Sequence, residues 1–252
     1  MKPALDLHNL SFSIGKEHHI LKDITFSIGK GEFVVLGGRN GTGKSMLMRI
    51  IKGLLQPSGG TIFIDGVDLS RKPKTRNRSV GLVFQDADAQ VVGQTVERDI
   101  LFGLDNLGIT GQERSARLDD TVSLLGLQSV LHQRPRTLSG GERRRLAIAG
   151  VLVMKPHVLM LDEPFANLDY PGIVSVLESL VALKEQGITI LVATHEIEKV
   201  LAHADSLMLL DQGVIAAQGN PAMVLDVVGD YGIRRPHFKG TPIEVGELTW
   251  LK

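Results

Sequence analysis

The sequence contains no cysteine among its 252 residues. Disulfides and thiolate zinc sites are therefore excluded, and the composition suits a reducing compartment such as the cytosol. The sequence also has no net charge at neutral pH, because 28 basic residues balance 28 acidic ones. Binding to nucleic acid or to an anionic membrane usually needs an excess of positive charge, so we expect no nucleic-acid partner.

Long hydrophobic runs are also absent. No apolar stretch approaches the ~18–20 residues that span a bilayer, and the opening sequence MKPALDLHNL lacks the long apolar core of a signal peptide. If the protein works at a membrane, we expect another subunit to hold it there. A chain of 252 residues is long enough for one large or two modest domains with a proper core.

The strongest local signal lies in residues 33–52. The apolar run Phe33–Leu36 predicts a buried strand, and the apolar positions of residues 46–54 recur at helical spacing. Between them Gly38–Ser45 reads GRNGTGKS, which matches the phosphate-binding pattern G-x-x-x-x-G-K-S. The alternative is a glycine-rich turn that binds nothing. A strand before the motif and a helix after it favour the phosphate site.

Each part of this motif has a chemical purpose. Gly38, Gly41 and Gly43 let the backbone curl so that its N–H groups face a polyphosphate, and the helix N-terminus adds its dipole. Lys44 can reach the β- and γ-phosphates, and the Ser45 hydroxyl is placed to ligate Mg²⁺. The motif therefore predicts a nucleotide site.

Polar residues follow three other predicted strands. The apolar runs and the polar residues after them are Val80–Phe84 with Gln85, Val158–Leu161 with Asp162 and Glu163, and Thr189–Ala193 with Thr194 and His195. In a mostly parallel sheet, ligands bind beyond the carboxyl ends of the strands. Because Lys44 also follows a strand, we expect these polar side chains to converge on one phosphate site.

Two regions differ in pattern from this core. Residues 4–30, together with residues 61–69, alternate apolar and polar side chains and predict a half-exposed antiparallel sheet. His18 and His19 fall between two of its strands, where we expect a solvated loop. Residues 91–156 have mostly helical patterns, and they predict a helical subdomain that interrupts the main sheet.

Two helix starts in this insert carry the capping pattern in which Glu follows Ser or Thr after three residues. They are Thr110–Glu113 and Ser139–Glu142. In Leu138–Glu142, which reads LSGGE, the glycines and the helix N-terminus would equally expose backbone donors to a phosphate. Taken alone, this segment favours a helix cap, and the arginine run at 143–145 favours a solvated helix face.

The order of the motifs is typical of one family. The phosphate loop, LSGGE at 138–142 and VLMLDEP at 158–164 are followed by ANLD at 166–169 and ATH at 193–195. This pattern, over essentially residues 4–220, resembles the nucleotide-binding subunit of ATP-binding cassette (ABC) transporters. The resemblance implies an ATP-hydrolysing enzyme that also needs Mg²⁺. It also implies a head-to-tail dimer, with itself or with a second ABC ATPase, that encloses two ATP molecules.

The same resemblance implies an α/β fold. Its parts are a P-loop NTPase (RecA-like) core, an antiparallel β-subdomain and a helical subdomain at about 91–156. The ABC ATPase domain would span residues 1–220, and residues 221–252 would form a short extension after it, either a small dimer contact or a loose tail.

The resemblance also assigns roles to residues. The expected nucleotide-binding residues are Gly38, Asn40, Gly41, Gly43, Lys44 and Ser45, and those serving the other protomer's site are Ser139, Gly140, Gly141 and Asp169. The expected Mg²⁺ ligands are Ser45, Gln85 and, mainly through water, Asp162. In catalysis, Glu163 would polarise the attacking water, His195 would contact the γ-phosphate, and Gln85 would sense metal and water. Such catalysis is mainly positioning and charge stabilisation.

A longer stretch narrows the resemblance. VFQDADAQ at 83–90, followed by TVERDILFG at 95–103 and NLG at 106–108, is similar to the ATPases of energy-coupling factor importers. That group takes up vitamins and cobalt or nickel ions. The similarity implies a transmembrane coupling subunit and, through it, a substrate-binding membrane subunit. It places the protein peripherally on the cytoplasmic face of the cell membrane.

The residues after Gln85 suggest how that coupling would occur. We expect a groove between the core and the insert, bordered by residues 85–92, to receive a short helix of the coupling subunit. Val91 and Val92 would supply apolar contact, and Asp88 and other polar neighbours would meet polar groups at the rim. The alternative is that both valines simply pack inside the insert.

The sequence leaves two further questions open. Ile14 stands where the family usually has the aromatic residue that stacks on adenine. Two other functions also remain: a soluble ABC ATPase not coupled to transport, and a P-loop kinase, for which LSGGE and the following DEP have no purpose. Neutral charge and the lack of coiled-coil heptads argue against DNA repair. Capture of a membrane partner would favour transport.

Overall fold

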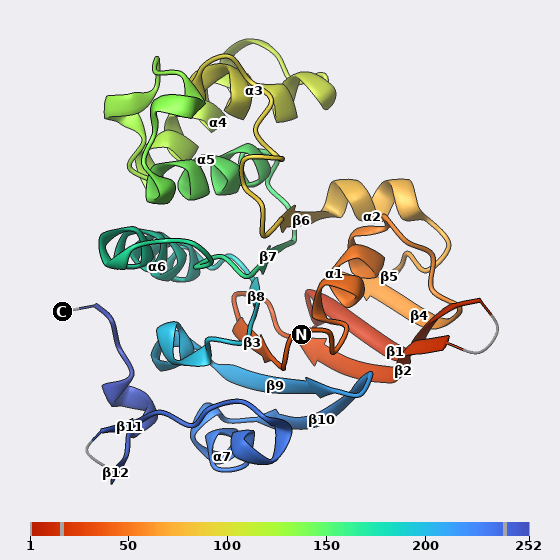
Figure 1. Cartoon of the computed structure of the whole chain (residues 1–252). Helices are drawn as coiled ribbons and strands as arrows, with labels where there is room; N and C mark the ends of the chain where they lie inside the picture. Colours follow the sequence, from red (N-terminus) through yellow and green to blue (C-terminus); the bar gives the residue numbers. More distant parts are fainter. Residues whose placement is uncertain (1, 16–17, 239–240, 252) are drawn as a thin grey trace.

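A computed structural model describes residues 2–15, 18–238 and 241–251. Its centre is a six-stranded sheet in the order β10-β9-β3-β8-β7-β6 (Figure 1). Neighbouring strands run parallel, except that β10 is antiparallel to β9. The strands are β3 (Phe33–Gly37), β6 (Val80–Val83), β7 (Val158–Asp162), β8 (Ile190–Thr194), β9 (Ser206–Asp211) and β10 (Val214–Gly219).

The inner strands explain why the sheet is covered on both faces. β3, β7 and β8 are buried along their whole length, as continuous apolar runs predict for parallel strands. Side chains alternate between two cores: Phe33 and Val35 pack with the helical insert and α6 (Tyr170–Glu185), whereas Val34 and Leu36 pack with α1 (Lys44–Lys52) and the second sheet. The main sheet thus separates two hydrophobic cores.

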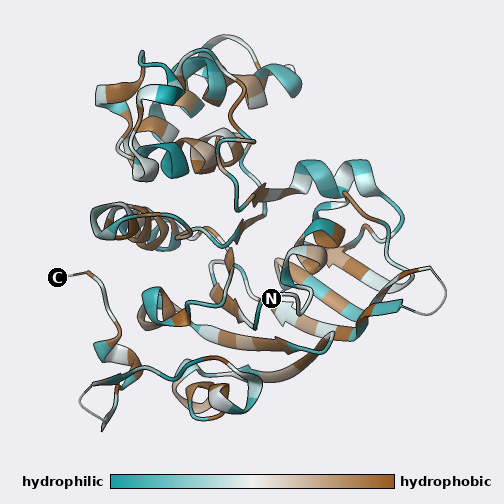
Figure 2. Ribbon diagram, in the orientation of Figure 1, coloured by the Kyte–Doolittle hydropathy of each residue, from teal (hydrophilic) through white to brown (hydrophobic). Residues whose placement is uncertain are grey.

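The second sheet is antiparallel, in the order β2-β1-β4-β5. Its strands are β1 (Leu5–Ile14), β2 (His18–Ile28), β4 (Gly59–Ile64) and β5 (Val67–Asp68). Brown and teal bands alternate along β1 and β2 in Figure 2, as expected of a sheet with one covered face. The loop expected at His18 and His19 was wrong, because both begin β2, where His19 Nδ1 lies 2.8 Å from Ser13 Oγ.

Helices gather in the insert between β6 and β7 (Figure 1). They are α3 (Val96–Asn106), α4 (Gly111–Leu124), the 3₁₀ turns η1 (Gln128–Val130) and η2 (Pro135–Thr137), and α5 (Gly140–Leu152). Ser139 forms the expected capping box at α5. The one expected at Thr110 is not formed within the described residues, because its side chain accepts no backbone hydrogen bond although it is the N-cap of α4.

The remaining elements are short. α2 (Pro73–Ser79) precedes β6, and η3 (Ile197–Lys199) and η4 (Leu201–His203) follow β8. Beyond β10 lie α7 (Pro221–Leu225), η5 (Val228–Tyr231), β11 (His237–Phe238), β12 (Thr241–Pro242) and η6 (Val245–Glu247), with α7 packed on β9 and β10. In the ranges that the structure describes, no helix is both long and apolar enough to cross a bilayer.

A substitution at Gly81 of β6 can test how closely α5 packs on the sheet. A Cβ added at this β6 position would overlap Val151 Cγ1 and lie 3.1 Å from Pro156 Cγ. Both side chains are stiff, so we predict that Gly81→Ala lowers the free energy of unfolding by about 1–3 kcal/mol through overpacking. Gly59→Ala is the control, since nothing lies within 4 Å of its new Cβ. Denaturant unfolding of both variants checks this, and equal stabilities would contradict the packing.

Candidate functional site

The carboxyl ends of four adjacent parallel strands meet at one edge of the main sheet. β3, β8, β7 and β6 lie side by side in that order, and ligands bind at such an edge. The expected convergence holds for Lys44, Glu163 and His195, because both Lys44 and His195 contact the Glu163 carboxylate. Gln85 follows β6 at the outer end of this row; its backbone oxygen accepts from Arg144 at 2.9 Å, and its side chain makes no hydrogen bond within the described residues.

The phosphate-loop backbone depends on its glycines. Gly38, at φ 158, has no room for a side chain, because a Cβ would lie 2.5 Å from the carbonyl oxygen of Leu210. Gly41, at φ 85, faces open space. Gly43, at φ 107, is the N-cap of α1, and no side chain of the described residues caps that helix. The N–H groups of its first turn are thus available to an anion.

Lys44 is nearly buried, with 6% of its surface exposed. Its Nζ donates to the carbonyl oxygens of Gly38 at 2.6 Å and Arg39 at 3.1 Å. The same nitrogen lies 3.7 Å from Glu163 Oε1. Burial lowers the pKa of Lys44, and the carboxylates of Glu163 and Asp162 oppose that shift. The phosphate loop thus holds a desolvated ammonium group, which the negative charge of a bound phosphate would stabilise.

Glu163 is held by the residues that follow β8. Thr194 Oγ1 donates to its Oε2 at 2.8 Å, and the backbone N–H of His195 donates to its Oε1 at 3.1 Å. His195 Nδ1 lies 2.9 Å from that same oxygen. Thr194 was expected at this edge of the sheet, but no role was assigned to it. The sequence feature that pointed to Thr194 is its position as a polar residue at the end of a buried apolar strand.

Asp162 presents an unsatisfied oxygen. The residue is 6% exposed, and its Oδ1 has no hydrogen-bond partner within the described part of the chain. Burial raises the pKa of Asp162, while a hydrogen bond with the Ser45 hydroxyl opposes that shift. A buried, unpaired carboxylate oxygen is costly, and carboxylate and hydroxyl oxygens are ligands that Mg²⁺ prefers. The pair therefore fits Mg²⁺.

The metal would need further ligands from outside the chain. No group of three His, Cys, Asp or Glu residues within the described ranges is arranged to hold an ion. Mg²⁺ commonly binds through one or two protein ligands together with substrate phosphates and water. A site of Ser45 and Asp162 therefore suits a metal that arrives with a nucleotide.

Ser139 and Asp169 cap two adjacent helices. Ser139 Oγ accepts from the N–H of Glu142 at 3.3 Å, and Asp169 Oδ1 accepts from the N–H of Gly172 at 3.0 Å. A Cβ on Gly141 would lie 3.0 Å from Gly172 Cα, so the helices pack closely there. Among the described residues, no hydrogen bond or ion pair joins this pair of caps to Lys44 or to Glu163.

Arg144 differs from a solvated helix residue. It is 4% exposed, and its guanidinium donates to the carbonyl oxygens of Phe84 and Gln85, each at 2.9 Å. It also reaches the carbonyl oxygen of Ala166 at 3.5 Å. Two segments that border the candidate site, at residues 84–85 and at Ala166, are therefore joined by one side chain of α5. Nothing in the local arginine run at 143–145 distinguishes this buried member.

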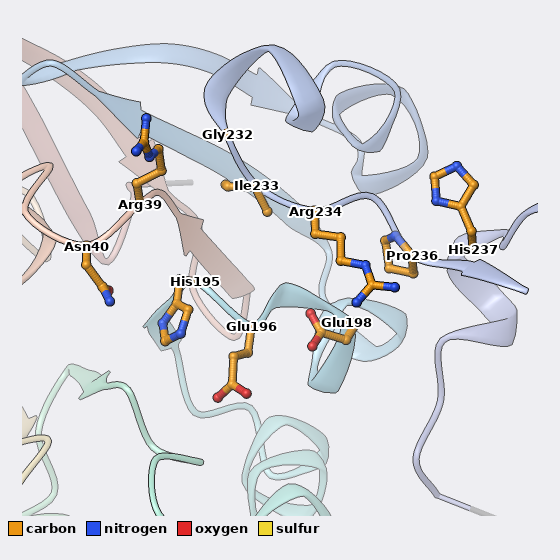
Figure 3. Close-up of a pocket in the computed structure, with 10 residues that line it drawn as sticks. All are labelled: Arg39, Asn40, His195, Glu196, Glu198, Gly232, Ile233, Arg234, Pro236 and His237. Carbon is orange, nitrogen blue, oxygen red and sulfur yellow. The ribbon is translucent and has the colours of Figure 1, made fainter.

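A pocket of ≈ 620 Å³ lies beside the phosphate loop (Figure 3). Arg39, Asn40 and His195 line one side, and residues 232–234 with 236 and 237 line another. A Cβ on Gly232 would lie 2.5 Å from Arg39 Cδ, so the later segment packs directly on the loop. Asn40 is exposed to this pocket. The sequence did not predict that residues beyond 220 would reach the site.

Together the fold and the site define a P-loop nucleotide-binding protein. The family model of the ABC transporter matches residues 21–166. The energy-coupling factor transporter ATP-binding protein EcfA2 of Clostridium perfringens is 38% identical over 239 residues, which are 92% of this chain and 84% of that protein. The energy-coupling factor transporter ATP-binding protein EcfA1 of Enterococcus faecalis is 38% identical over 228 residues, which are 89% of this chain and 81% of that protein.

A solved structure agrees with these similarities. That of cbiO1 from Clostridium perfringens, described as part of the ABC transporter complex cbiONQ, has a TM-score of 0.83 at 36% identity, covering 93% of this chain and 96% of that one. The chain belongs to the ABC transporter family. The predicted α/β fold of the P-loop NTPase class is confirmed, and nucleotide binding comes with the family.

Ile14 stands where the family resemblance expects the residue that stacks on adenine. Ile14 ends β1, is 56% exposed and pairs with His18 of β2. β2 passes over the phosphate loop, since a Cβ on Gly43 would lie 3.0 Å from Leu21 Cδ2 and 3.5 Å from Ile20 Cγ2. The side chain of Ile14 is therefore exposed at the end of a strand that pairs with β2.

We predict that Ile14→Tyr binds ATP several-fold more tightly than the natural protein. Aromatic stacking contributes ~0.5–1.5 kcal/mol beyond area burial, which an isoleucine does not supply. Titration calorimetry of both proteins with ATP measures the difference, and Ile14→Leu is the matched control. Equal affinities of the tyrosine and leucine variants would show that residue 14 does not lie against the base.

Proposed function

We propose that this protein is the ATP-hydrolysing motor subunit of a membrane importer of the energy-coupling factor type, for metal ions or vitamins. The observation that carries the proposal is the buried Glu163, which Thr194 and His195 hold 3.7 Å from Lys44 beside an uncapped helix N-terminus. The similarity to proteins named as energy-coupling factor ATP-binding subunits supports the type of importer. The motor works peripherally at the cytoplasmic face of the membrane.

On binding, the ATP phosphates take the place of the intramolecular hydrogen bonds of Lys44 and His195. Lys44 leaves the carbonyl oxygens of Gly38 and Arg39 for the β- and γ-phosphates, which offer full negative charges to a desolvated cation. The N–H groups of the loop and of the first turn of α1 bind the phosphate oxygens. His195 turns from Glu163 to the γ-phosphate, which leaves the carboxylate free to accept a proton.

The remaining polar residues of the site would bind Mg²⁺ and the attacking water. Ser45 and Asp162 Oδ1 would hold Mg²⁺, directly or through water, and Gln85, which follows β6, would be a further ligand. When bound, Mg²⁺ supplies positive charge that neutralises the phosphate oxygens as the terminal bond breaks. Glu163 accepts a hydrogen bond from the attacking water and polarises it. Thr194 keeps the carboxylate in place during this step.

A second ATPase protomer completes each site. Among the described residues, no hydrogen bond or ion pair joins Ser139, Gly140 or Gly141 to Lys44, yet they form the start of a helix whose first-turn N–H groups can meet a γ-phosphate. A head-to-tail dimer, with a copy or with a related subunit, places this segment on the partner's nucleotide. Asp169 lies at the neighbouring helix start and faces the same interface.

The coupling subunit docks in a groove between the core and the insert. A groove of ≈ 470 Å³ runs between α1, α2 and β6 on one side and α3 and α5 on the other. Leu54, Val92 and Phe102 line it, with 45%, 63% and 51% of their surfaces exposed. Val91 is packed against the core of the insert, so only Val92 of the two valines offers free apolar area. An apolar strip in a polar rim suits a short amphipathic helix.

The acidic residues before Val92 have local partners. Asp88 forms an ion pair with Arg143 at 3.0 Å, and Asp86 Oδ1 accepts from the N–H groups of Asp88 and Ala89. Gln90 Oε1 accepts from the N–H of Phe84 at 3.0 Å, which ties it to the end of β6. These side chains shape the loop beside the groove, and the apolar residues supply the docking contact.

The proposed chemistry predicts two different defects. Glu163→Gln keeps ATP binding but lowers turnover at least about a hundredfold, because an amide of the same size polarises water poorly. Lys44→Ala weakens ATP binding about tenfold or more, because a desolvated charge contact to phosphate is lost. Calorimetric binding and steady-state phosphate release measure both. A fully active Glu163→Gln enzyme would remove the assignment of the base.

The docking groove predicts a loss of partners without loss of hydrolysis. We expect Val92→Asp and Phe102→Asp to reduce capture of a membrane subunit from co-expressing cells, and uptake of its solute, about tenfold, because each places a charge in an apolar contact. ATP hydrolysis by the isolated protein should persist. Val67→Asp, 52% exposed on β5, is the matched control. Unchanged capture and uptake in both groove variants would rule out this docking site.

A further inference from the structure

The segment 248–251 packs against the elements that follow β7 and β8. Leu248 is 6% exposed within the core, and Leu251 packs partly buried against the same core. Thr249 Oγ1 lies 3.2 Å from His203 Nε2 in η4. In Figure 1 the chain beyond η6 runs up beside α6 and the short helices after β8. The segment therefore has a defined place beside the candidate site.

Trp250 contacts the first residue of α6. Its ring centroid lies 5.6 Å from that of Tyr170, with an angle of 31° between the ring planes. Tyr170 directly follows Asp169, whose side chain caps α6. Tyr170 is 54% exposed, so the indole covers one side of an otherwise open ring. The contact fixes the start of the helix on which Asp169 lies.

Trp250 also contacts the segment after β8. Lys199 Nζ lies 6.0 Å from the centroid of the Trp250 ring, within cation–π range. The same ammonium pairs with Glu196 Oε1 at 2.6 Å, and the N–H of Glu196 donates to Thr194 Oγ1 at 3.0 Å. Thr194 in turn donates to Glu163. A continuous chain of contacts thus leads from the indole to the carboxylate.

We propose that Trp250 is a positioning residue that holds the start of α6 and the segment after β8 in a fixed relation. The proposal rests on the roles assigned above to Asp169 and to the Thr194–His195 pair. These two segments leave neighbouring strands and, within the described residues, Trp250 contacts both. In the part of the chain that the structure describes, no aromatic or cation–π contact joins the phosphate loop to the indole. The residue therefore acts on the placement of catalytic groups rather than on capture of ATP.

This placement predicts a split between binding and turnover. In the 252-residue protein, Trp250→Ala should lower kcat about tenfold, because small displacements of reacting groups are costly. The Kd for ATP should stay within about twofold, since Lys44 and the loop are untouched. Trp250→Phe should keep at least about half of the kcat, because it retains an aromatic face for Tyr170 and Lys199. Met223→Ala, at a residue 75% exposed in α7, is the control.

Fluorescence tests the contact itself. Trp250 is the single tryptophan of the sequence, so the intrinsic emission of the protein comes from this position. Tyr170→Ala should move the emission maximum to longer wavelength as water reaches the indole, and Met223→Ala should not. An unchanged maximum in Tyr170→Ala would overturn the contact on which the proposal depends.

The results with these variants distinguish a failure of the Trp250 proposal from a failure of the proposed motor function. If Glu163→Gln loses turnover while Trp250→Ala keeps a normal kcat, the positioning role is wrong and the motor assignment stands. A fall in kcat for Trp250→Ala that only matches a smaller folded fraction, measured by thermal unfolding, would also overturn it. So would a Trp250→Phe variant as impaired as Trp250→Ala. A natural protein without ATP turnover would overturn both proposals.

Discussion

The structure depends on one buried pair of opposite charges. Lys44 and Glu163 lie 3.7 Å apart, each only 6% exposed, at the carboxyl ends of β3 and β7 with β8 between them. Two charges taken from water are costly unless they are paired and hydrogen-bonded. The carbonyl oxygens of Gly38 and Arg39 on one side, and Thr194 on the other, supply those bonds. The protein thus holds a site whose own contacts a polyphosphate can replace.

The parallel sheet links this pair to the rest of the molecule. β6 brings Gln85 to the same edge, and Arg144 of α5 binds the backbone there and near Ala166. A change in the γ-phosphate environment can therefore reach the insert through one rigid side chain. The apolar groove lies between that insert and the core, so rotation of one against the other changes its shape. In the proposed function, such a rotation would move the docked helix of the coupling subunit during ATP hydrolysis.

Local patterns predicted much of the fold and most of the site geometry. The phosphate loop, the buried strands and the capping box at Ser139 each depend on residues close in sequence, so their patterns were sufficient. The strand at His18 and the burial of Arg144 depend on contacts with distant segments, which no local pattern contains. The same applies to Trp250, whose partners lie far away along the chain. Roles of the individual site residues remain predictions.

The central claim is that ATP phosphates bind between Lys44 and Glu163, with Mg²⁺ on Ser45 and Asp162. The most direct measurement is a crystal structure of the Glu163→Gln protein with ATP and Mg²⁺. We predict β- and γ-phosphate oxygens within hydrogen-bond distance of Lys44 Nζ, and metal density beside Asp162 Oδ1. A nucleotide bound elsewhere, or an empty phosphate loop at saturating ATP, would contradict the account.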